Sequence, residues 1–163
     1  MRTIEKAKAE ELSAILKIYE KAKEFMVKSG NPNQWRDGYP QEEVLLDDIA
    51  QGNLYVIKEN GVICAAFVLA IDNEPNYEEI EDGEWLFSGE YGTIHRVASN
   101  GEHSGIFADT LAFCERKIKH LRIDTHSDNR VMRRLIEKHG FKKCGVIRIK
   151  ADDNSPRIAY EKF

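Results

Sequence analysis

The segment from Tyr91 to Phe141 constrains the fold most, because it alternates between strand and helix patterns. It predicts strands at Tyr91–Ala98 and Leu121–Thr125, each followed by a helix, at Gly105–Lys119 and Asp128–His139. A strand–helix–strand passage implies a right-handed crossover between parallel strands. The turn before the first helix, residues 99–106, would aim backbone N–H groups at an anion, which the helix dipole also favours. The segment therefore predicts a site for a phosphorylated ligand.

The remaining elements add strands and helices around this central unit. Apolar residues recur at helical spacing in Glu10–Lys28 and Gln41–Ala50. Further strands are expected at Met1–Lys6, Leu54–Lys58, Val62–Ile71, Lys142–Lys150 and Arg157–Phe163. Asn60-Gly61 indicates a tight hairpin, since both central residues of such a turn need positive φ. The element order predicts an α/β (α+β) fold in which helices cover the faces of a mixed sheet.

The length of 163 residues suits one domain spanning the whole chain, residues 1–163. The net charge of −4 provides no basic field, so we expect no nucleic-acid and no membrane partner. Met1–Lys6 lacks the apolar core of a signal peptide, and the longest apolar run, Val62–Ile71, suits a buried strand. The three widely spaced cysteines indicate buried reduced thiols. These features favour a cytoplasmic protein.

Two motifs in the second half of the chain resemble those of a known family. The strand end His95-Arg96-Val97 is followed by the loop Glu102-His103-Ser104-Gly105-Ile106-Phe107, and Asn129 opens a helix that ends at Gly140-Phe141. Together with the element order, these motifs resemble the GNAT superfamily of acyl-CoA-dependent N-acetyltransferases along essentially the whole chain. The loop Gln34–Pro40 is similar to a bacterial-type subgroup of mostly uncharacterised acetyltransferases. The resemblance implies a mostly antiparallel central sheet with a β-α-β acyl-CoA-binding core.

The resemblance also implies how acetyl-CoA would bind as cosubstrate. The backbone of His95, Arg96 and Val97 would contact the thioester carbonyl and the pantetheine. The pyrophosphate would lie on the loop residues Glu102, His103, Ser104, Gly105, Ile106 and Phe107. The hydroxyl of Ser104 could contact a phosphate, cap the helix that follows, or do both. Asn129 would hydrogen-bond the pantetheine arm, or it could cap its own helix. We expect no metal, although Asp124, His126 and Asp128 also fit a metal-site pattern by chance.

Three residues depart from the family pattern. Glu102 stands where the loop usually has Arg or Gln, and a carboxylate near a pyrophosphate is unfavourable. Phe107 would bring a large side chain toward the phosphates. Ile136 stands where many members have a tyrosine that protonates the departing thiolate, yet a thiol with a pKa of about 8.5 leaves without much protonation. Two functions stay open: an active N-acetyltransferase and a non-catalytic acyl-CoA-binding module.

The general base has several candidates. Asp124 lies near the end of a predicted strand, where half-burial would raise its pKa into a useful range; the alternative is a solvent-facing carboxylate. His126 follows two residues later, on the same side by strand alternation. His95 could also act on the amine, because it would lie beside the thioester. A cysteine nucleophile is a further alternative, although Cys114 and Cys144 sit in apolar patterns.

The acceptor is expected to be a primary amine of a small molecule or peptide. Trp35, Tyr39 and Trp85 are the candidate walls of its site. Nearby acids would suit a cationic amine, namely Asp37, Glu79, Glu81 and Glu84. The alternative is core packing beside a solvated acidic loop, since Asp72–Glu84 is acidic and rich in turn residues. The last strands of this fold often pair between subunits, which leaves a homodimer open.

Overall fold

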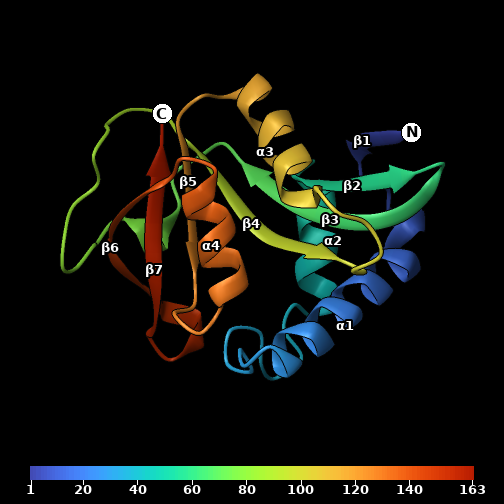
Figure 1. Ribbon diagram of the computed structural model, residues 1–163, viewed down its shortest axis with the longest axis horizontal. Helices are drawn as coiled ribbons and strands as arrows, with labels where there is room; N and C mark the ends of the chain where they lie inside the picture. The colour runs from blue at the N-terminus through green and yellow to red at the C-terminus, as the bar shows by residue number, and fades with distance from the viewer.

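The computed structural model describes residues 1–163 as one seven-stranded sheet with helices on both faces (Figure 1). The strands are β1 (Arg2–Lys6), β2 (Leu54–Glu59), β3 (Val62–Ala70), β4 (Gly92–Ser99), β5 (Leu121–Thr125), β6 (Lys142–Ile149) and β7 (Ser155–Lys162). Their order in the sheet is β1-β2-β3-β4-β5-β7-β6. Only β4 and β5 pair in parallel, and all other neighbours are antiparallel. The predicted mixed, mostly antiparallel sheet is confirmed.

Four α-helices cover this sheet: α1 (Leu12–Lys28), α2 (Glu42–Ala50), α3 (Ile106–Lys117) and α4 (Arg130–Lys138). Three short 3-10 turns lie in the connections between other elements: η1 (Ala9–Glu11) before α1, η2 (Pro75–Tyr77) between β3 and β4, and η3 (Lys150–Asp152) between β6 and β7. Helix α3 makes the predicted crossover from β4 to β5. None of the helices combines the length and the apolar character that a membrane span requires.

Two hydrophobic cores lie on opposite faces of the sheet. One packs α3 and α4 on the sheet, with Leu111 and Ile136 buried against strand residues such as Phe67. The other packs α1 and α2 on the opposite face, around Tyr19 and Leu45. Burial of apolar surface at about 25 cal/mol per Å² makes these two layers the main source of stability. The helices therefore hold the central strands from both sides.

The central strands β4 and β5 separate soon after they begin. Their pairing covers only Gly92–Ile94 against Leu121–Ile123. Beyond Ile94, β4 contains a bulge, since Ala66 pairs with Ala98 while Val68 pairs with His95. Arg96 in this bulge has a φ of 49°. Figure 1 shows the two strands diverging from there. From His95 onward, the edge of β4 that faces β5 has no strand partner, which opens the middle of the sheet.

The segment Asp72–Glu84 is more ordered than its composition indicates. Tyr77 is 2% exposed and packs with Tyr91 and Ile147 in a third apolar cluster. An isolated β-bridge joins Glu81 to Val146. The prediction of a solvated excursion is therefore wrong for its central part, because a single aromatic residue anchors it to the sheet. Its remaining acidic side chains are mostly exposed, as expected.

Candidate functional site

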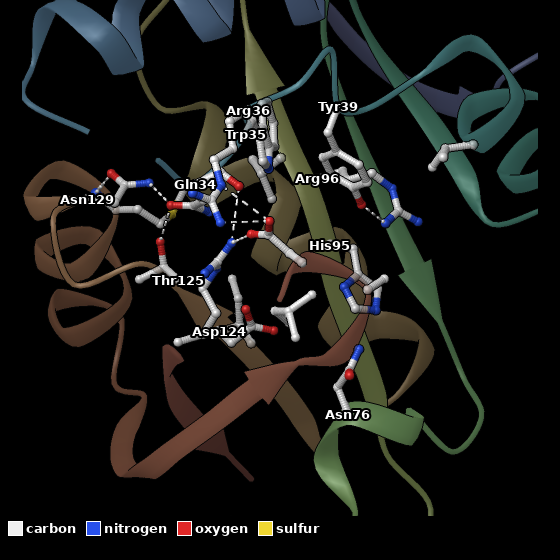
Figure 2. A pocket seen from close by; sticks show the side chains of 18 of the residues that line it. Gln34, Trp35, Arg36, Tyr39, Asn76, His95, Arg96, Asp124, Thr125 and Asn129 are labelled. Carbon is white, nitrogen blue, oxygen red and sulfur yellow. Dashed lines mark hydrogen bonds and ion pairs between the residues drawn. The ribbon is translucent and has the colours of Figure 1, made fainter. Parts of the chain in front are cut away.

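A cavity of about 520 Å³ lies where β4 and β5 separate (Figure 2). Its walls come from the α1–α2 loop, the divergent ends of β4 and β5, the start of α4, η2 and the β6–β7 connection. Predicted site residues that line it are Trp35, Tyr39, His95, Arg96, Val97, Asp124 and Asn129. Residues far apart in the sequence thus meet at one opening in the sheet.

Asp124 faces this cavity from the end of β5. Its Oδ2 accepts a hydrogen bond of 2.6 Å from the Tyr77 hydroxyl, while Oδ1 has no hydrogen-bond partner in the protein. Burial raises the pKa of Asp124, and the hydrogen bond from Tyr77 and the nearby side chains of His95 and Arg157 act in the opposite direction. The alternative of a solvent-facing carboxylate does not hold. One oxygen of a partly desolvated carboxylate is free to accept a proton.

His95 lies on the same face of the sheet, in the part of β4 that has left β5. Its Nε2 is 3.4 Å from Glu74 Oε2, and its Nδ1 has no protein partner. Burial alone would raise the pKa of Glu74, but the bond from His95 holds it below its ordinary value. The backbone N–H of Glu74 donates to the Tyr91 hydroxyl at 2.8 Å. Sequence reasoning missed Glu74, which carries no signal beyond one more acid in an acidic segment.

His126 does not join Asp124 in the cavity. Strand β5 ends at Thr125, so the alternation that predicted a shared side stops one residue too early. The His126 ring turns back on its own chain, where Nδ1 accepts the Asp128 backbone N–H at 3.0 Å. Burial lowers the pKa of His126. The geometry therefore gives no support to His126 as the base.

Gln34 ties the α1–α2 loop to the ends of β5 and α4. Its Oε1 accepts hydrogen bonds from Thr125 Oγ1 at 3.1 Å and Asn129 Nδ2 at 3.0 Å, and from the backbone N–H of His126 at 3.3 Å (Figure 2). Asn129 Oδ1 accepts the Met132 N–H at 3.1 Å, so Asn129 does cap α4. The sequence indicated the loop Gln34–Pro40 as a motif, but it did not predict that Gln34 would connect this loop to β5 and α4.

The side chain of Arg96 is fully occupied by the protein. Its Nε and Nη2 bind both oxygens of Asp48, at 2.9 and 2.8 Å, and Nη1 donates to the Tyr39 hydroxyl at 2.8 Å. The Tyr19 hydroxyl donates to the carbonyl of Arg96 at 2.6 Å. Val97 packs against the core. The bulge therefore offers a ligand its backbone rather than these side chains, and Tyr39 serves both as wall and as support.

The loop from Asn100 to Gly105 follows the end of β4 and lies outside the lining of the cavity. Gly105 is the N-cap of α3 in the left-handed region, with a φ of 76°. The backbone N–H groups from His103 to Ala108 have no acceptor in the protein. Ser104 is exposed and does not cap the helix, contrary to one of its two expected roles. A run of free donors at a helix N-terminus suits an anion.

The two unusual residues of this loop leave those donors accessible. Phe107 is 4% exposed and points into the core, where its ring packs on His139, so the expected obstruction of the phosphates is wrong. The carboxylate of Glu102 is exposed and accepts a hydrogen bond of 3.2 Å from Asn100 Nδ2. Arg2 brings a cation near Gly105 and donates to Asp109 at 2.7 Å. Sequence reasoning missed Arg2, which is distant in the chain.

The aromatic residues predicted as acceptor walls separate into two groups. Trp35 lines the cavity and packs on Tyr19. Trp85 lies elsewhere, where its Nε1 donates to the Tyr77 carbonyl at 2.9 Å and its ring covers Arg122. Trp85 is therefore not a wall of this cavity. The acids expected beside it are also absent from the lining, except Asp37, because the bridge to Val146 holds their segment at the edge strand β6.

Neither a cysteine nucleophile nor a proton donor on α4 finds support. All three cysteines are buried and free. Burial raises the pKa of the Cys114 thiol to about 12 and that of Cys144 to about 11, which keeps both protonated at neutral pH. Ile136 is fully buried in the core under α4. Of the candidates for proton transfer that the sequence offered, Asp124 and His95 remain in the cavity.

The chain matches no model of a known protein family and no curated protein. Solved structures do match. A GNAT-family acetyltransferase from Streptococcus agalactiae 2603 is 29% identical, with a TM-score of 0.87 over 99% of this chain and 95% of that one. A protein from Staphylococcus aureus Mu50, proposed to be an acetyltransferase, is 28% identical, with a TM-score of 0.68 over 98% and 97% of the two chains.

The PaiA N-acetyltransferase from Thermoplasma acidophilum, solved in complex with coenzyme A, shares the fold at 17% identity. Its TM-score is 0.65 over 100% of this chain and 99% of that one. The chain thus has the GNAT fold, and the resemblance to the GNAT superfamily that its sequence motifs indicated is confirmed.

Proposed function

We propose that this protein is an N-acetyltransferase that transfers the acetyl group of acetyl-CoA to a primary amine by direct attack. The observation that carries the proposal is the opening between β4 and β5, with a cavity beside it and free N–H groups at the start of α3. The fold supports acyl transfer in general. The three buried free thiols fit a reducing, cytoplasmic compartment.

The residues present fit acetyl-CoA as cosubstrate. It would supply the acetyl group as an activated thioester. The N–H groups from His103 to Ala108 would hold its pyrophosphate, and the unpaired edge of β4 would pair with its pantetheine amides as an added strand. The coenzyme A complex of the Thermoplasma relative supports this assignment. Asn129, at the edge of the cavity, would contact the arm with whatever capacity its bond to Gln34 leaves.

Asp124 is the residue we assign as general base. An attacking amine must lose a proton, and Asp124 Oδ1 is free to accept it inside the cavity. A raised pKa makes a carboxylate a better proton acceptor near neutral pH. His95 is the second candidate, since its Nδ1 is unoccupied and its ring lies near Asp124 in Figure 2. The Tyr77 hydroxyl holds the carboxylate in place.

Two measurements test the proposal. Calorimetric titration with acetyl-CoA should show saturable binding, and a panel of amines, amino acids and peptides should include acceptors that release free CoA. The control is the same panel without protein, which corrects for spontaneous thioester hydrolysis. Absence of acetyl-CoA binding would refute both the transferase and any acyl-CoA-binding role.

The alternative is a non-catalytic acyl-CoA-binding module. The observation in its favour is Ile136, which is buried in the core at the position where many members of the superfamily have a tyrosine that protonates the departing thiolate. The chemistry tolerates this loss, because a thiol has a pKa of about 8.5 and leaves readily as the anion. Saturable acetyl-CoA binding with no CoA release from any acceptor would favour the module.

A further inference from the structure

Two arginines form one wall of the cavity, and a single carboxylate lies between them. Arg36 Nε and Nη2 donate to Asp152 Oδ1, at 3.3 and 3.1 Å, and Arg157 Nη2 donates to Asp152 Oδ2 at 3.3 Å. All three residues line the cavity. Two guanidinium groups thus share one carboxylate, and the carboxylate of Asp37, which also lines the cavity, forms no ion pair with either of them. We call Arg36, Asp152 and Arg157 the arginine wall.

Arg157 is the fixed member of the arginine wall and Arg36 the available one. The Arg157 side chain is 5% exposed and also donates to the Gln34 carbonyl at 3.1 Å. The Arg36 side chain is 41% exposed, and its Nη1 has no hydrogen-bond partner. A guanidinium with an unused N–H group can donate it to a second carboxylate while it keeps its hydrogen bonds to the first. The wall is therefore already aligned for one further anionic group.

Sheet register places this wall beside the proposed base. Asp124 pairs with Ala159 across β5 and β7, and Arg157 lies two residues before Ala159 on the same face. The positive charge of Arg157 is close enough to act on the Asp124 carboxyl. Figure 2 shows Arg36 and Trp35 on the loop side of the cavity and Asp124 with His95 on the strand side. A molecule in the cavity would meet a cationic wall at one end and a proton acceptor at the other.

Three of the four acids that favoured a cationic acceptor lie outside the cavity, and the fourth, Asp37, lines it. Glu81 is bound to Arg148 on the outer surface, and Glu79 and Glu84 are exposed outside the cavity. Of the other acids in the lining, Glu74 is engaged by His95, Asp152 is bound by both arginines, and Asp124 is the proposed base.

We propose that the acceptor is a primary amine that also bears a carboxylate, such as an amino acid. Arg36 binds the carboxylate, and the amine faces Asp124 and His95. This inference rests on the proposed transferase function and narrows its substrate class. It also makes Arg36 a specificity-determining residue, since an amine without the anionic group would lack its main anchor.

The test compares matched acceptors, each amino acid with its decarboxylated amine, in assays of CoA release. We expect kcat/KM for the better amino acids to exceed that of their amines at least tenfold. In R36Q this preference should fall at least tenfold through a higher KM for the amino acid. R148Q is the matched control, because Arg148 is equally exposed and also binds a carboxylate, Glu81, outside the cavity. Equal use of both members of each pair, or an unchanged preference in R36Q, would overturn the proposal.

The inference can fail separately from the transferase function. If decarboxylated amines are acetylated as well as amino acids, the transferase stands and the carboxylate subsite is refuted. If acetyl-CoA binds but no amine is acetylated, calorimetry can measure the affinity of the protein for each amino acid and for its decarboxylated amine. These affinities then decide whether the cavity has a site for a carboxylate. Amino acids that bind more tightly than their decarboxylated amines, with this difference lost in R36Q, would support the arginine wall as an anion site. If no amino acid binds, the arginine wall is refuted as an anion site.

Discussion

At the scale of single residues, Asp124 shows how burial and one neighbour prepare a carboxylate for proton transfer. Burial raises its pKa, while Tyr77 occupies only Oδ2. We predict that D124N lowers kcat at least tenfold, because the amide cannot accept the amine proton. Acetyl-CoA affinity should change less than twofold, since the residue faces the acceptor side. Paired kinetics and calorimetry check this. Unchanged turnover would move the role of base to His95 or water.

Although D124N should lower turnover, it should raise the stability of the folded protein at neutral pH. A group whose pKa is raised by folding stabilises the protein below its unfolded pKa, and that contribution is lost as pH rises through the folded value. D124N, which stays neutral, should therefore melt at a higher temperature than the wild type at pH 7. The difference should shrink as pH falls toward about 4, the ordinary range of an aspartate. Melting curves of both proteins across this range test the sign, and a less stable D124N at pH 7 would contradict it.

At the scale of elements, local patterns predicted nearly all helices and strands. The Asn60-Gly61 turn has the expected positive φ angles, 51° and 82°, because its geometry depends on those two residues alone. The bulge at Arg96 was not predictable from local pattern. It depends on Asp48 from α2, Tyr39 from a loop and Tyr19 from α1. Sequence reasoning found the chemistry-bearing strands but not the distant partners that shape them.

The bulge in β4 provides the next prediction. D48A would leave the Arg96 guanidinium partly buried without its carboxylate partner, and loss of one member of such a pair costs about 3–5 kcal/mol. We expect a lower urea midpoint and weaker acetyl-CoA binding, because the backbone of His95–Val97 would lose its fixed geometry. D47N, at the neighbouring exposed position, is the control and should leave both unchanged. Wild-type acetyl-CoA affinity in a folded D48A would show that the bulge does not position the ligand.

The loop before α3 permits a test of its unusual acid. Glu102 is exposed beside free N–H groups that favour an anion. Removing a like charge at about 4 Å is worth about 1 kcal/mol in water, which is roughly a fivefold gain in affinity. E102Q should therefore bind acetyl-CoA several-fold more tightly at low salt, with a smaller gain at high salt. E20Q, on the exposed side of α1, is the charge-matched control. Equal affinities of E102Q and wild type would place Glu102 away from the phosphates.

At the scale of the whole molecule, the sheet is open in its centre and must be held together elsewhere. The buried carboxylate of Glu161 on β7 accepts hydrogen bonds from His120 Nε2 at 2.6 Å and Arg122 Nε at 2.8 Å, beside and within β5. It also accepts the backbone N–H groups of Leu86 and Phe87, at 2.7 and 3.1 Å. One carboxylate thus connects β5, β7 and the loop before β4, on the side where the central strands are still paired.

This cluster gives the molecule a defined response to acid. Burial alone would raise the pKa of Glu161, but the bonds from His120 and Arg122 hold it below the ordinary value of 4.5. A group with a lowered folded pKa stabilises the protein above its unfolded pKa, and that contribution is lost as pH falls through the lowered value. E161Q should therefore be destabilised by about 3–5 kcal/mol at pH 7, because Arg122 loses its buried partner. Its deficit relative to wild type should shrink below pH 4.5, the ordinary value.

Urea unfolding at several pH values measures this deficit directly. E81Q serves as the control, since it removes a carboxylate from an exposed ion pair with Arg148 near the same loop. Such exposed pairs contribute little to stability, so E81Q should remain close to wild type at every pH. If E161Q were as stable as E81Q at pH 7, the hydrogen bonds of Glu161 to β5 and to the loop before β4 would not stabilise the protein. If its deficit were equally large at low pH, the effect would arise from packing rather than from the charge of Glu161.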